Sequence, residues 1–584
     1  MEPRYPVILR DPASGTWLNF EQPVRIITTA RLDQVLPALR EIETEVNQNG
    51  WFAAGFISYE ASPAFESALT TSPPDHFPLL WFGLYPAPHR IDSLPPRSGP
   101  YQLGTWRPSI NRKAYTAAIA HIKRQIARGK TYQVNYTFRL RNSFAGSPWS
   151  LFLDMLNDQA PGYAAFIDTG AYAICSASPE LFFQLDANAV TCRPMKGTLK
   201  RGRTLAEDNA QAAWLQASVK NRAENVMIVD MLRNDLGRLA KTGSVHVPEL
   251  FSIERYPTLW QMTSTVTAEI DAPFTKIITA LFPCASITGA PKISTTQIIA
   301  GLEPDPRHIY TGSIGYLARG RKAQFNVAIR TLLIELQTGQ AEYGIGGGIV
   351  WDSTPADEYA EALLKARVLT ERQPEFSLLE TLRWTSQDGF FLLAEHLQRL
   401  SDSAAYFGFP FERIRIEAFL ADTGLKLPDA PQRVRLLLDR VGNLSHQAFP
   451  LTVEAREQPL RVRLAGKPVS SADVFLYHKT TWRAVYETAR HSQPDCEDVL
   501  LYNERAELTE ASLANLVFEL DGELVTPPVT CGLLAGTYRA SLLAQGQIRE
   551  KAVTLSDLPL CTKIFLINSV RGWQTAVLLN DKNP

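Results

Sequence analysis

Apolar residues recur along most of the chain with strand-like or helical spacing, and turn residues separate these runs. The first hundred residues are predicted to contain strands at 24–28, 52–59 and 79–85 and a helix at 32–46. A second helix is expected over residues 115–129, where apolar residues recur every three or four positions before a glycine. The pattern therefore predicts a chain that mixes strands with helices.

A hairpin is predicted within the stretch Ser176–Thr204, with strands at 181–185 and 189–192 joined by a turn. Glu180 precedes the first strand and Lys196 follows the second, so the hairpin brings both to the same end of a sheet. A carboxyl group and an amine held in a partly dry site shift each other's pKa and can serve as acid and as nucleophile or base. Taken alone, the pair also fits a structural ion pair beside a glycine turn.

Three carboxylates are predicted to lie on helices. Glu224 begins the apolar part of a helix over 220–235, and Glu358 and Glu361 share one face of a helix that starts near residue 355. Lys365 lies on the same face, four residues after Glu361. Two carboxylates that face a third can hold a hard divalent ion such as magnesium, although an exposed Glu–Lys helix face has the same spacing.

Three further motifs are suited to binding a carboxylate. Residues 286–292, which include Thr288 and Gly289, read as a turn that opens a helix, where backbone amides can receive an anion. Arg330 lies in an alternating run read as a strand, from which a guanidinium can bind a carboxylate with two parallel hydrogen bonds. The triplet Gly346, Gly347 and Gly348 lets the backbone approach a ligand closely, although such triplets also form turns.

A short polar run with a proline at 371–375 marks a boundary, and residues 376–584 form a second unit. Residues 473–479 read as an apolar strand that ends in Lys479, and the loop around 532–539 opens a helix. A hairpin is expected at Asp521-Gly522. A pyridoxal phosphate site needs a lysine, a carboxylate at the ring nitrogen and a cationic, amide-rich phosphate cup. The parts are present as Lys479, Glu510, Arg399 and the amides of residues 536–538, each of which in isolation is also an ordinary surface residue.

Composition limits the possible function classes. The chain is 45% hydrophobic and 20% charged, which is ordinary for soluble globular proteins. A net charge of −1 argues against binding to nucleic acid or to an anionic membrane. No apolar run approaches the roughly 20 residues that span a bilayer. The six cysteines form no CxxC pair, which favours a reduced, cytoplasmic setting without structural zinc.

Ser178-Pro-Glu180 followed by Pro194-Met-Lys-Gly-Thr198 resembles the chorismate-utilising enzymes. Lysine in the third place of the second motif resembles the aminodeoxychorismate synthase component I group, whereas anthranilate synthases usually carry alanine there. The resemblance is close from about residue 110 to 368 and weaker before it. Two positions depart from the usual pattern, because Asn221 stands where relatives have an acidic residue and Gln261 where many have histidine.

This resemblance implies a set of roles. Lys196 would add to C2 of the chorismate ring, and Glu180 would be the general acid for the departing C4 hydroxyl. Glu224 and Glu361 would bind Mg²⁺ with Glu358 as an outer partner. Tyr310 and Arg330 would hold the carboxylate of the enolpyruvyl arm. The remaining substrate-binding positions are Thr288, Gly289, Gly346, Gly347, Gly348 and Lys365.

The second unit resembles the fold-type IV pyridoxal-phosphate family, and especially its aminodeoxychorismate lyases, over nearly all of 376–584. The resemblance gives Lys479 the Schiff base and Glu510 the ring nitrogen. The phosphate would lie on Arg399 with Gly536, Thr537 and Tyr538. The usual Pro-Gly-Ile-Thr loop is here Ala535-Gly-Thr-Tyr538, so a phenol stands where a small hydroxyl is expected.

Together the two resemblances imply two domains and one pathway. Residues 1–370 would be the synthase unit, with an N-terminal part at 1–100 and a core at 110–368, followed by a linker at 371–375 and the lyase unit at 376–584. The implied fold class is α+β: large antiparallel sheets flanked by helices, then a fold-type IV unit with two small α/β subdomains. The implied reactions turn chorismate and ammonia into aminodeoxychorismate and then into 4-aminobenzoate on the folate route.

The two resemblances also suggest partners and alternative functions. Because no Gly-x-Cys-x-Gly glutaminase motif is present, ammonia is expected from solution or from a separate glutamine amidotransferase. A homodimer through the pyridoxal-phosphate unit is a further expectation. The alternatives are an anthranilate or isochorismate synthase fused to a branched-chain or D-amino-acid transaminase, and a second unit that only scaffolds or regulates.

Overall fold

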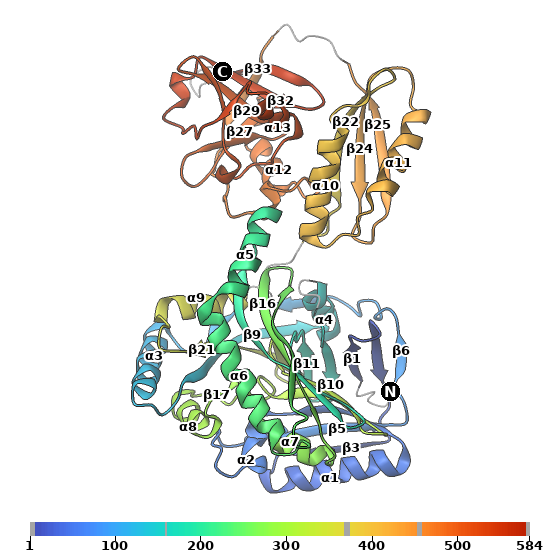
Figure 1. Cartoon of the computed structure of the whole chain (residues 1–584), viewed down its shortest axis with the longest axis vertical. Coiled ribbons are helices and arrows are strands. Elements are labelled where there is room, and N and C mark those ends of the chain that lie inside the picture. Colours follow the sequence, from blue (N-terminus) through green and yellow to red (C-terminus); the bar gives the residue numbers. More distant parts are fainter. Residues whose placement is uncertain (1–5, 158–160, 367–373, 453–457, 580–584) are drawn as a thin grey trace. The chain divides into compact units, whose positions relative to one another are not determined.

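A computed structural model describes residues 6–157, 161–366, 374–452 and 458–579 (Figure 1). The chain divides into two compact units. The first consists of Met1–Lys200 and Ala212–Gln373, and the second of Arg201–Gln211 and Pro374–Pro584. Residues 371–373 of the expected linker lie outside the described residues. The pattern of the sequence did not predict that residues 201–211 belong with the second unit.

The first sheet of the first unit has 11 strands within the described residues, and every pairing in it is antiparallel. Across the sheet the strands are β17 (Gly289–Ala290), β9 (Gln133–Gly146), β21 (Gln340–Ile349), β20 (Thr331–Glu335), β11 (Tyr172–Ser176), β10 (Ala165–Asp168), β1 (Val7–Asp11), β2 (Thr16–Phe20) and β6 (His89–Ile91), with β7 (Tyr101–Leu103) and β8 (Arg107–Pro108) paired to β9. The glycine triplet therefore lies inside a strand, where Gly348 pairs with Asn135.

The second sheet has ten antiparallel strands within the described residues. In order they are β14 (Met195–Lys200), β16 (Leu259–Glu269), β13 (Ala189–Arg193), β12 (Leu181–Asp186), β19 (Lys322–Asn326), β18 (Ser313–Ala318), β4 (Phe52–Ile57), β5 (Leu80–Tyr85) and β3 (Arg25–Thr29), with β15 (His246–Arg255) paired to β16. The predicted hairpin is confirmed, since β12 pairs with β13. The three predicted strands near the N-terminus are confirmed as β3, β4 and β5.

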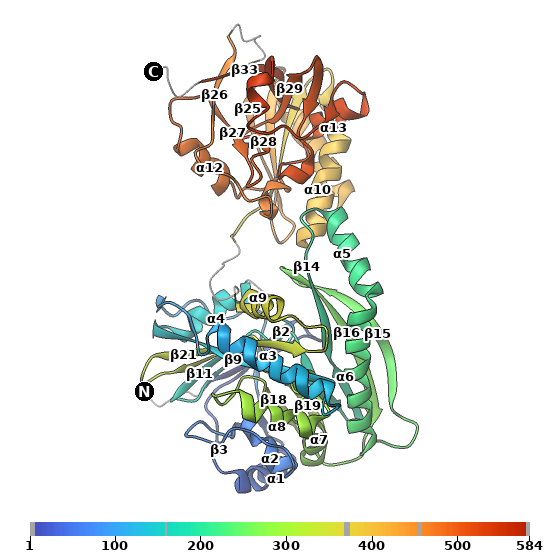
Figure 2. The same ribbon diagram turned by 90° about the vertical axis from the view of Figure 1, so that its left-hand side faces the viewer.

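Helices cover both sheets. Their bounds are α1 (Leu32–Asn49), α2 (Ser62–Phe65), α3 (Arg112–Ala127), α4 (Pro148–Asn157), α6 (Val219–Gly237), α7 (Phe274–Leu281), α8 (Lys292–Leu302) and α9 (Pro355–Ala366), with 3₁₀ turns η1 (Tyr59–Ala61) and η2 (Ala285–Ile287). Helix α5 (Leu205–Ala217) begins among residues 201–211, which belong to the second unit. The predicted helices are confirmed as α1, α3, α6 and α9. Figure 2 shows α3 and α9 packed on β21, and α6 contacts β14 and β16. Side chains of Asn111 and Ser218 cap α3 and α6.

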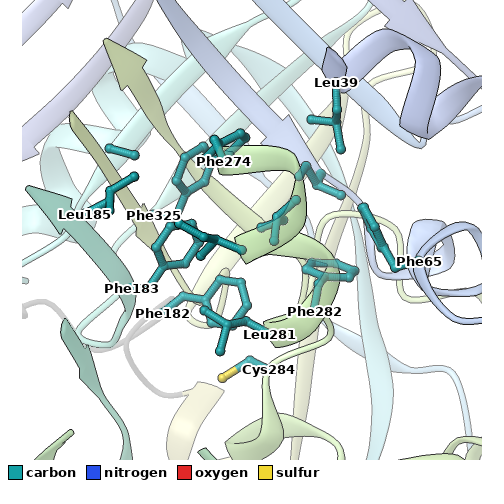
Figure 3. Packing of buried hydrophobic residues seen from close by; sticks show 14 of the residues in the cluster. Leu39, Phe65, Phe182, Phe183, Leu185, Phe274, Leu281, Phe282, Cys284 and Phe325 are labelled. Carbon is teal, nitrogen blue, oxygen red and sulfur yellow. The ribbon is translucent and has the colours of Figure 1, made fainter. Parts of the chain in front are cut away.

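An aromatic cluster forms the core beneath the second sheet (Figure 3). Phe183 of β12 stacks on Phe325 of β19, with ring centroids 5.4 Å apart, and Phe274 of α7 lies 5.4 Å from Phe325. Each fully buried phenylalanine contributes about 1.5–3 kcal/mol relative to exposure. This core fixes β12 and β13, and it therefore also positions Glu180 and Lys196, which flank the hairpin.

The second unit contains two sheets within its described residues. The smaller has the order β23 (Gly389–Phe390), β22 (Leu378–Thr385), β24 (Gln432–Leu438) and β25 (Leu444–Pro450), with helices α10 (Leu393–Phe407) and α11 (Arg413–Lys426). The larger has the order β28 (Leu508–Ala511), β27 (Asp498–Tyr502), β26 (Leu460–Leu464), β33 (Gly572–Leu578), β32 (Lys563–Asn568), β29 (Asn515–Leu520), β30 (Glu523–Thr526) and β31 (Arg549–Glu550). The hairpin predicted at Asp521-Gly522 is confirmed, because β29 pairs with β30.

One predicted strand of this unit is wrong. Residues 473–479 form a 3₁₀ turn, η4 (Val474–Leu476), and Lys479 follows it outside any strand. Asp473 stabilises this turn by accepting a hydrogen bond of 2.9 Å from the backbone N–H of Phe475. Such a local cap offers the backbone an alternative to a sheet ladder. The remaining helices are α12 (Ala484–His491) and α13 (Thr537–Ala544), with η5 (Val529–Cys531) and η6 (Leu558–Leu560). Among the described residues, no helix has the length and apolar character needed to cross a membrane.

Candidate active sites

Glu180 is buried at the start of the hairpin, with 2% of its surface exposed. Its Oε1 atom accepts a hydrogen bond of 2.6 Å from the Ser286 hydroxyl and a longer one of 3.4 Å from the backbone N–H of Met195. Burial raises the pKa of Glu180 to about 7, against the opposing effects of Ser286 and Lys196. At neutral pH a large fraction of this carboxyl group is protonated, so it can donate a proton.

Lys196 lies on β14 and belongs to the same electrostatic cluster. Burial lowers its pKa, while Glu224 and Glu180 oppose this shift and Lys365 adds to it. Its Nζ atom lies 3.2 Å from the point where a Cβ on Gly348 would stand. A lowered pKa increases the neutral fraction of the amine, which is the form that can act as a nucleophile.

Gln261 ties the segment around Lys196 to the neighbouring strand. Its side-chain N–H donates to the carbonyl of Gly197 at 3.0 Å, and its carbonyl accepts from the Thr198 hydroxyl at 3.0 Å. Gly197 has φ +93°, where an L side chain is strained, and a Cβ there would meet Asn221 at 3.1 Å. The two departures from the family pattern thus both contact this irregular part of β14, where the pairing with β16 shifts register. Gln261 holds this part of the strand and carries no titratable proton.

The three predicted metal-binding carboxylates do not converge as a set of three. Among the described residues, no group of three or more His, Cys, Asp or Glu side chains could hold a metal ion. Glu358 accepts a hydrogen bond of 2.6 Å from Ser353, and Glu361 forms an ion pair of 2.8 Å with Lys365. Lys365 also donates to the carbonyl of Gly346 at 3.0 Å.

Two of these carboxylates still fit magnesium. Burial raises the pKa of Glu224, and the charge of Glu361 adds to this shift, as expected for carboxylates close enough to repel each other. A cation between them would relieve that repulsion. Magnesium is usually bound by one or two carboxylates together with water and substrate oxygens, so Glu224 and Glu361 suffice.

Arg330 is not in a strand, contrary to the prediction. It occupies a bend between β19 and β20 with φ +50°, and its backbone carbonyl accepts from Ala177 N–H at 3.0 Å. Its guanidinium carbon lies 5.6 Å from the ring centre of Tyr256. Tyr310 is buried, and its ring packs against Gly344, with the guanidinium of Arg139 5.2 Å from the ring centre. The strained bend, rather than strand alternation, sets the direction of the Arg330 side chain.

The segment that carries Thr288 and Gly289 opens a helix, as predicted, but it also contains a short strand. Gly289 begins the two-residue strand β17, which pairs with β9, and α8 begins only at Lys292. The carbonyl of Thr288 accepts from Asn135 N–H at 2.9 Å. Gly289 has φ +125°, and a Cβ there would collide with the carbonyl of Gln133. Pairing with β9 therefore fixes this segment just before α8 begins.

The glycine triplet faces the charged groups of the first site. A Cβ on Gly347 would stand 3.3 Å from Glu358 Oε2 and 3.7 Å from Lys365 Nζ. A Cβ on Gly346 would collide with the Tyr136 carbonyl across the strand pair. These close approaches explain why no side chain is accommodated here.

The second site is a cavity of about 200 Å³ inside the second unit. All six residues expected at the pyridoxal phosphate line it: Arg399, Lys479, Glu510, Gly536, Thr537 and Tyr538. Burial lowers the pKa of Lys479 to about 8, and Arg399 adds to this shift. A lysine with a lowered pKa is suited to bonding with an aldehyde.

Glu510 is 4% exposed, and burial raises its pKa to about 7. Its Oε1 atom accepts from the Tyr486 hydroxyl at 2.6 Å and from the backbone N–H of Leu534 at 3.2 Å. Asn515 Nδ2 donates to Oε2 at 3.4 Å. This arrangement fixes the carboxyl group while leaving it able to share a proton, as the partner of a pyridine nitrogen must.

The expected phosphate cup has a cation and a helix N-terminus. Arg399 donates to both carboxylate oxygens of Glu380, at 2.9 and 2.6 Å, and to the carbonyl of Ala535 at 3.1 Å. Gly536 caps α13, and a Cβ there would collide with Asn515 Oδ1. Thr537 Oγ1 lies 3.3 Å from His396 Nε2. The residues present fit a phosphate group, with the Thr537 hydroxyl available where the family motif has its hydroxyl one position later.

Several residues of the two sites carried no signal in the sequence pattern. In the first site this is Gln133, and in the second Glu380, His396, Tyr486, Asn515 and the cavity-lining arginines Arg433, Arg483 and Arg571. Ser286 belongs to a motif that the sequence singled out, but its hydrogen bond to Glu180 was not predicted. Glu380 and His396 lie on different elements and meet only after folding, with Glu380 Oε2 2.6 Å from His396 Nδ1. Burial opposes ionisation of Glu380, but Arg399 and His396 together lower its pKa to about 2.

Residues 201–211 pack beside Lys479 within the second unit. The guanidinium of Arg203 donates to the Tyr477 hydroxyl at 2.8 Å, and that of Arg201 lies 4.3 Å from the ring centre of Tyr406. Arg201 also forms a buried ion pair of 2.6 Å with Asp208. This segment therefore supports the backbone that leads into Lys479.

Two family models match the chain, one in each unit. Residues 4–371 match the family model described as chorismate binding enzyme. The chain belongs to the chorismate-binding enzyme family. Residues 377–578 match the model described as amino-transferase class IV. Both predicted resemblances are confirmed, and so is the predicted α+β fold of a chorismate-binding unit followed by an amino-transferase class IV unit.

Relatives of the chorismate-binding unit include two curated proteins. The chain is 34% identical over 363 residues to "Aminodeoxychorismate synthase" of Streptomyces griseus, covering 62% of this chain and 46% of that protein. It is 39% identical over 269 residues to "Aminodeoxychorismate synthase component 1" of Escherichia coli K12, covering 46% of this chain and 59% of that protein. The chain thus spans about half to three fifths of the length of these relatives.

Solved structures of other chorismate-binding enzymes share the fold. Anthranilate synthase component I from Streptococcus pneumoniae has a TM-score of 0.53 at 23% identity, over 64% of this chain and 93% of that one. The menaquinone-specific isochorismate synthase MenF from Escherichia coli has a TM-score of 0.51 at 19% identity, over 63% of this chain and 89% of that one. At these identities the likeness is one of fold.

Proposed function

We propose that the first unit converts chorismate and ammonia into 4-amino-4-deoxychorismate and water, and that the second converts this product into 4-aminobenzoate and pyruvate. The observation that carries the first half is Lys196 in Pro194-Met-Lys-Gly-Thr198, beside the buried acid Glu180. The second half rests on Lys479 and Glu510 lining one cavity with the expected phosphate cup. The curated relatives named aminodeoxychorismate synthase favour this reaction over its rivals.

In the first site, Lys196 Nζ would form a bond to C2 of the ring while the C4–O bond breaks. Glu180 would give its proton to the departing oxygen, which leaves as water. Ammonia would then bond to C4 and displace Lys196 from C2, so the amine is regenerated. Electrons and atoms balance without a redox step. The raised pKa of Glu180 favours its acid form, and the lowered pKa of Lys196 increases the share of neutral amine, which supports these roles.

Glu224 and Glu361 would hold a magnesium ion in this site. When bound, the metal supplies Lewis-acid stabilisation of negative charge on the substrate. Arg330 and Tyr310 would bind the enolpyruvyl carboxylate, in line with the family pattern. Thr288, Gly289 and the glycine triplet would let the backbone approach the ring. Lys365 would compensate charge near Glu361, to which it is already paired.

In the second site, Lys479, Glu510, Arg399, Gly536, Thr537 and Tyr538 would hold pyridoxal phosphate. When bound, this cofactor supplies an electron sink for charge that develops at the substrate carbon bearing the amine. Lys479 would take the proton from C4, and the bond from C3 to the enolpyruvyl oxygen would then break. Glu510 would keep its proton shared with the ring nitrogen, fixed by Tyr486 and Asn515.

The partner proposed for the first unit is a separate glutamine amidotransferase that supplies ammonia. Relatives named "component 1" support a multi-component enzyme. We further propose that the protein acts in the cytoplasm and that the pyridoxal-phosphate unit forms homodimers, as the family pattern suggests.

Product identification tests the function. Purified protein would be supplied with chorismate, ammonium and Mg²⁺, and the products resolved by chromatography with mass detection. The proposal expects equal amounts of 4-aminobenzoate and pyruvate. Formation of anthranilate or isochorismate instead would assign the first unit to a rival reaction. Accumulation of aminodeoxychorismate without 4-aminobenzoate would indicate that the second unit is a scaffold without catalytic activity.

A further inference from the structure

Gln133 has a side-chain amide that is buried and unpaired. The residue is 1% exposed at the start of β9, and neither Nε2 nor Oε1 has a hydrogen-bond partner among the described residues. Its backbone, in contrast, is fully engaged: it pairs with Ala290 of β17, and its carbonyl accepts from the Thr131 hydroxyl at 2.9 Å. Among the buried amide side chains that the structure describes, only Gln133 leaves both polar atoms unpaired.

The unpaired amide is directed at the first site. A Cβ on Gly348 would collide with Gln133 Nε2, and the same point lies 3.2 Å from Lys196 Nζ. The amide and the amine therefore converge on one side of Gly348. A Cβ on Gly289 would collide with the carbonyl of Gln133 from the other side. Gln133 thus lies between the two glycine-bearing strands that flank the site.

Burying an amide without hydrogen bonds costs free energy, because both polar atoms have left water without a replacement partner. Such a group persists where a bound molecule satisfies it, and the binding free energy then includes the hydrogen bonds that the free protein lacks. The alternative, an amide retained for packing, has no reason to face the amine of Lys196.

We propose that Gln133 is a substrate-contacting residue of the first site, whose amide N–H donates to the ring carboxylate. This inference rests on the proposed function. If Lys196 bonds to C2, the ring carboxylate is attached to the adjacent carbon C1, so a donor beside Lys196 Nζ is within reach of its oxygens. The amide carbonyl is then free to accept an N–H of Lys196, which would orient the amine towards the ring.

The test replaces Gln133 by methionine, which keeps the length and volume of the side chain and removes both polar atoms. The thermal midpoint of the free protein should stay the same or rise, because an unpaired amide is removed from the interior. The value of kcat/KM for chorismate, at saturating ammonium and Mg²⁺, should fall about 10- to 100-fold. The rise in thermal midpoint that chorismate induces in the wild type should shrink in parallel.

The control is Ser150→Ala in α4, which also removes a buried, unpaired polar atom, at 0% exposure. This variant should keep both the wild-type kcat/KM and the chorismate-induced shift. A second variant, Gln133→Glu, should lose chorismate binding, because a carboxylate would replace the donor opposite the ring carboxylate.

Two results would overturn the inference: wild-type kinetics in Gln133→Met, or a lowered thermal midpoint of its free form, which would make the amide structural. Either leaves the proposed function standing as long as the wild type forms 4-aminobenzoate. A wild type that neither binds nor converts chorismate would instead remove the proposed function and this inference with it.

Discussion

The imidazole Nε2 of His478 lies 3.1 Å from the backbone carbonyl oxygen of Arg203, within the second unit. Burial lowers the pKa of His478 to about 4, so the ring is neutral at neutral pH. Its Nε2–H then donates to this carbonyl, while Nδ1 accepts from the Ser403 hydroxyl at 2.9 Å. Because His478 directly precedes Lys479, this hydrogen bond fixes the chain next to the lysine of the second site.

The folded second unit should lose stability in acid, because protonation of His478 charges a buried ring and removes the Nδ1 lone pair that accepts from Ser403. The unfolded chain takes up a proton on His478 near pH 6.5, whereas the folded unit does so only near pH 4. The stabilisation is therefore complete above about pH 6.5 and is lost as pH falls towards 4, by up to about 3 kcal/mol. Hydrogen exchange of residues 201–205, corrected for intrinsic rates, should accelerate over this window. His478→Asn should flatten this pH dependence, whereas His446→Asn, at an exposed position, should not. The same pH dependence in all three proteins would refute the assignment.

Glu180 should make the rate of the first reaction fall at alkaline pH. The acid form donates the proton, so kcat for aminodeoxychorismate formation should fall as pH rises through about 7. Glu180→Gln should reduce kcat by about 10²- to 10⁴-fold. In Ser286→Ala the Glu180 carboxylate loses a hydrogen bond that stabilises its charged form, so the pKa of Glu180 should rise. The fall in kcat should then occur at higher pH. If kcat of Ser286→Ala fell at the same pH as in the wild type, a group other than Glu180 would be responsible for the pH dependence.

Much of this arrangement could be predicted from sequence. The hairpin β12–β13 follows from two apolar runs joined by a turn, α6 from helical spacing that includes Val229, Leu232 and Leu236, and α9 from the helix start at Pro355. The motif Pro194–Thr198 located the reactive lysine. In the second unit, the turn at Asp521-Gly522 and the helix α13 were likewise predictable.

Other features could not be predicted from the spacing of apolar and polar residues. Arg330 lies in a left-handed bend that strand alternation cannot reveal, and Lys479 follows a 3₁₀ turn capped by Asp473 rather than a strand. Gln133 belongs to an ordinary strand in the sequence, and its unpaired amide becomes visible only in the folded site.

Removing magnesium should separate the two reactions. The carboxylates proposed to hold the metal, Glu224 and Glu361, are in the first unit only. EDTA should therefore abolish consumption of chorismate, and added Mg²⁺ should restore it. Conversion of supplied aminodeoxychorismate to 4-aminobenzoate should continue in EDTA at the rate of the untreated protein. If both reactions stopped together, the assignment of the metal to the first unit would be wrong.

Replacing Lys196 by alanine should end 4-aminobenzoate formation from chorismate. With C2 no longer occupied by the lysine, ammonia can reach that carbon, and anthranilate should appear among the products. Lys200→Ala, at an exposed position of the same strand, should retain wild-type output. Circular dichroism would establish that both variants are folded. Undiminished 4-aminobenzoate from Lys196→Ala would exclude the nucleophile assignment.

Borohydride treatment should locate the cofactor. In the wild type loaded with pyridoxal phosphate, reduction should attach the pyridoxyl group to Lys479, detected by mass spectrometry in the peptide around Tyr477–Trp482. Lys467 and Lys551 of the same unit do not line the cavity and serve as internal controls. Label on either of them, with Lys479 unmodified, would place the second site elsewhere.

The most direct test of two separate active sites is the product of Lys479→Ala given chorismate, ammonium and Mg²⁺. The account predicts that aminodeoxychorismate accumulates with no 4-aminobenzoate. Adding the Lys196→Ala protein to the same tube should then convert the accumulated compound to 4-aminobenzoate and pyruvate. Wild-type formation of 4-aminobenzoate by Lys479→Ala alone, or accumulation of anthranilate or isochorismate in its place, would contradict the account.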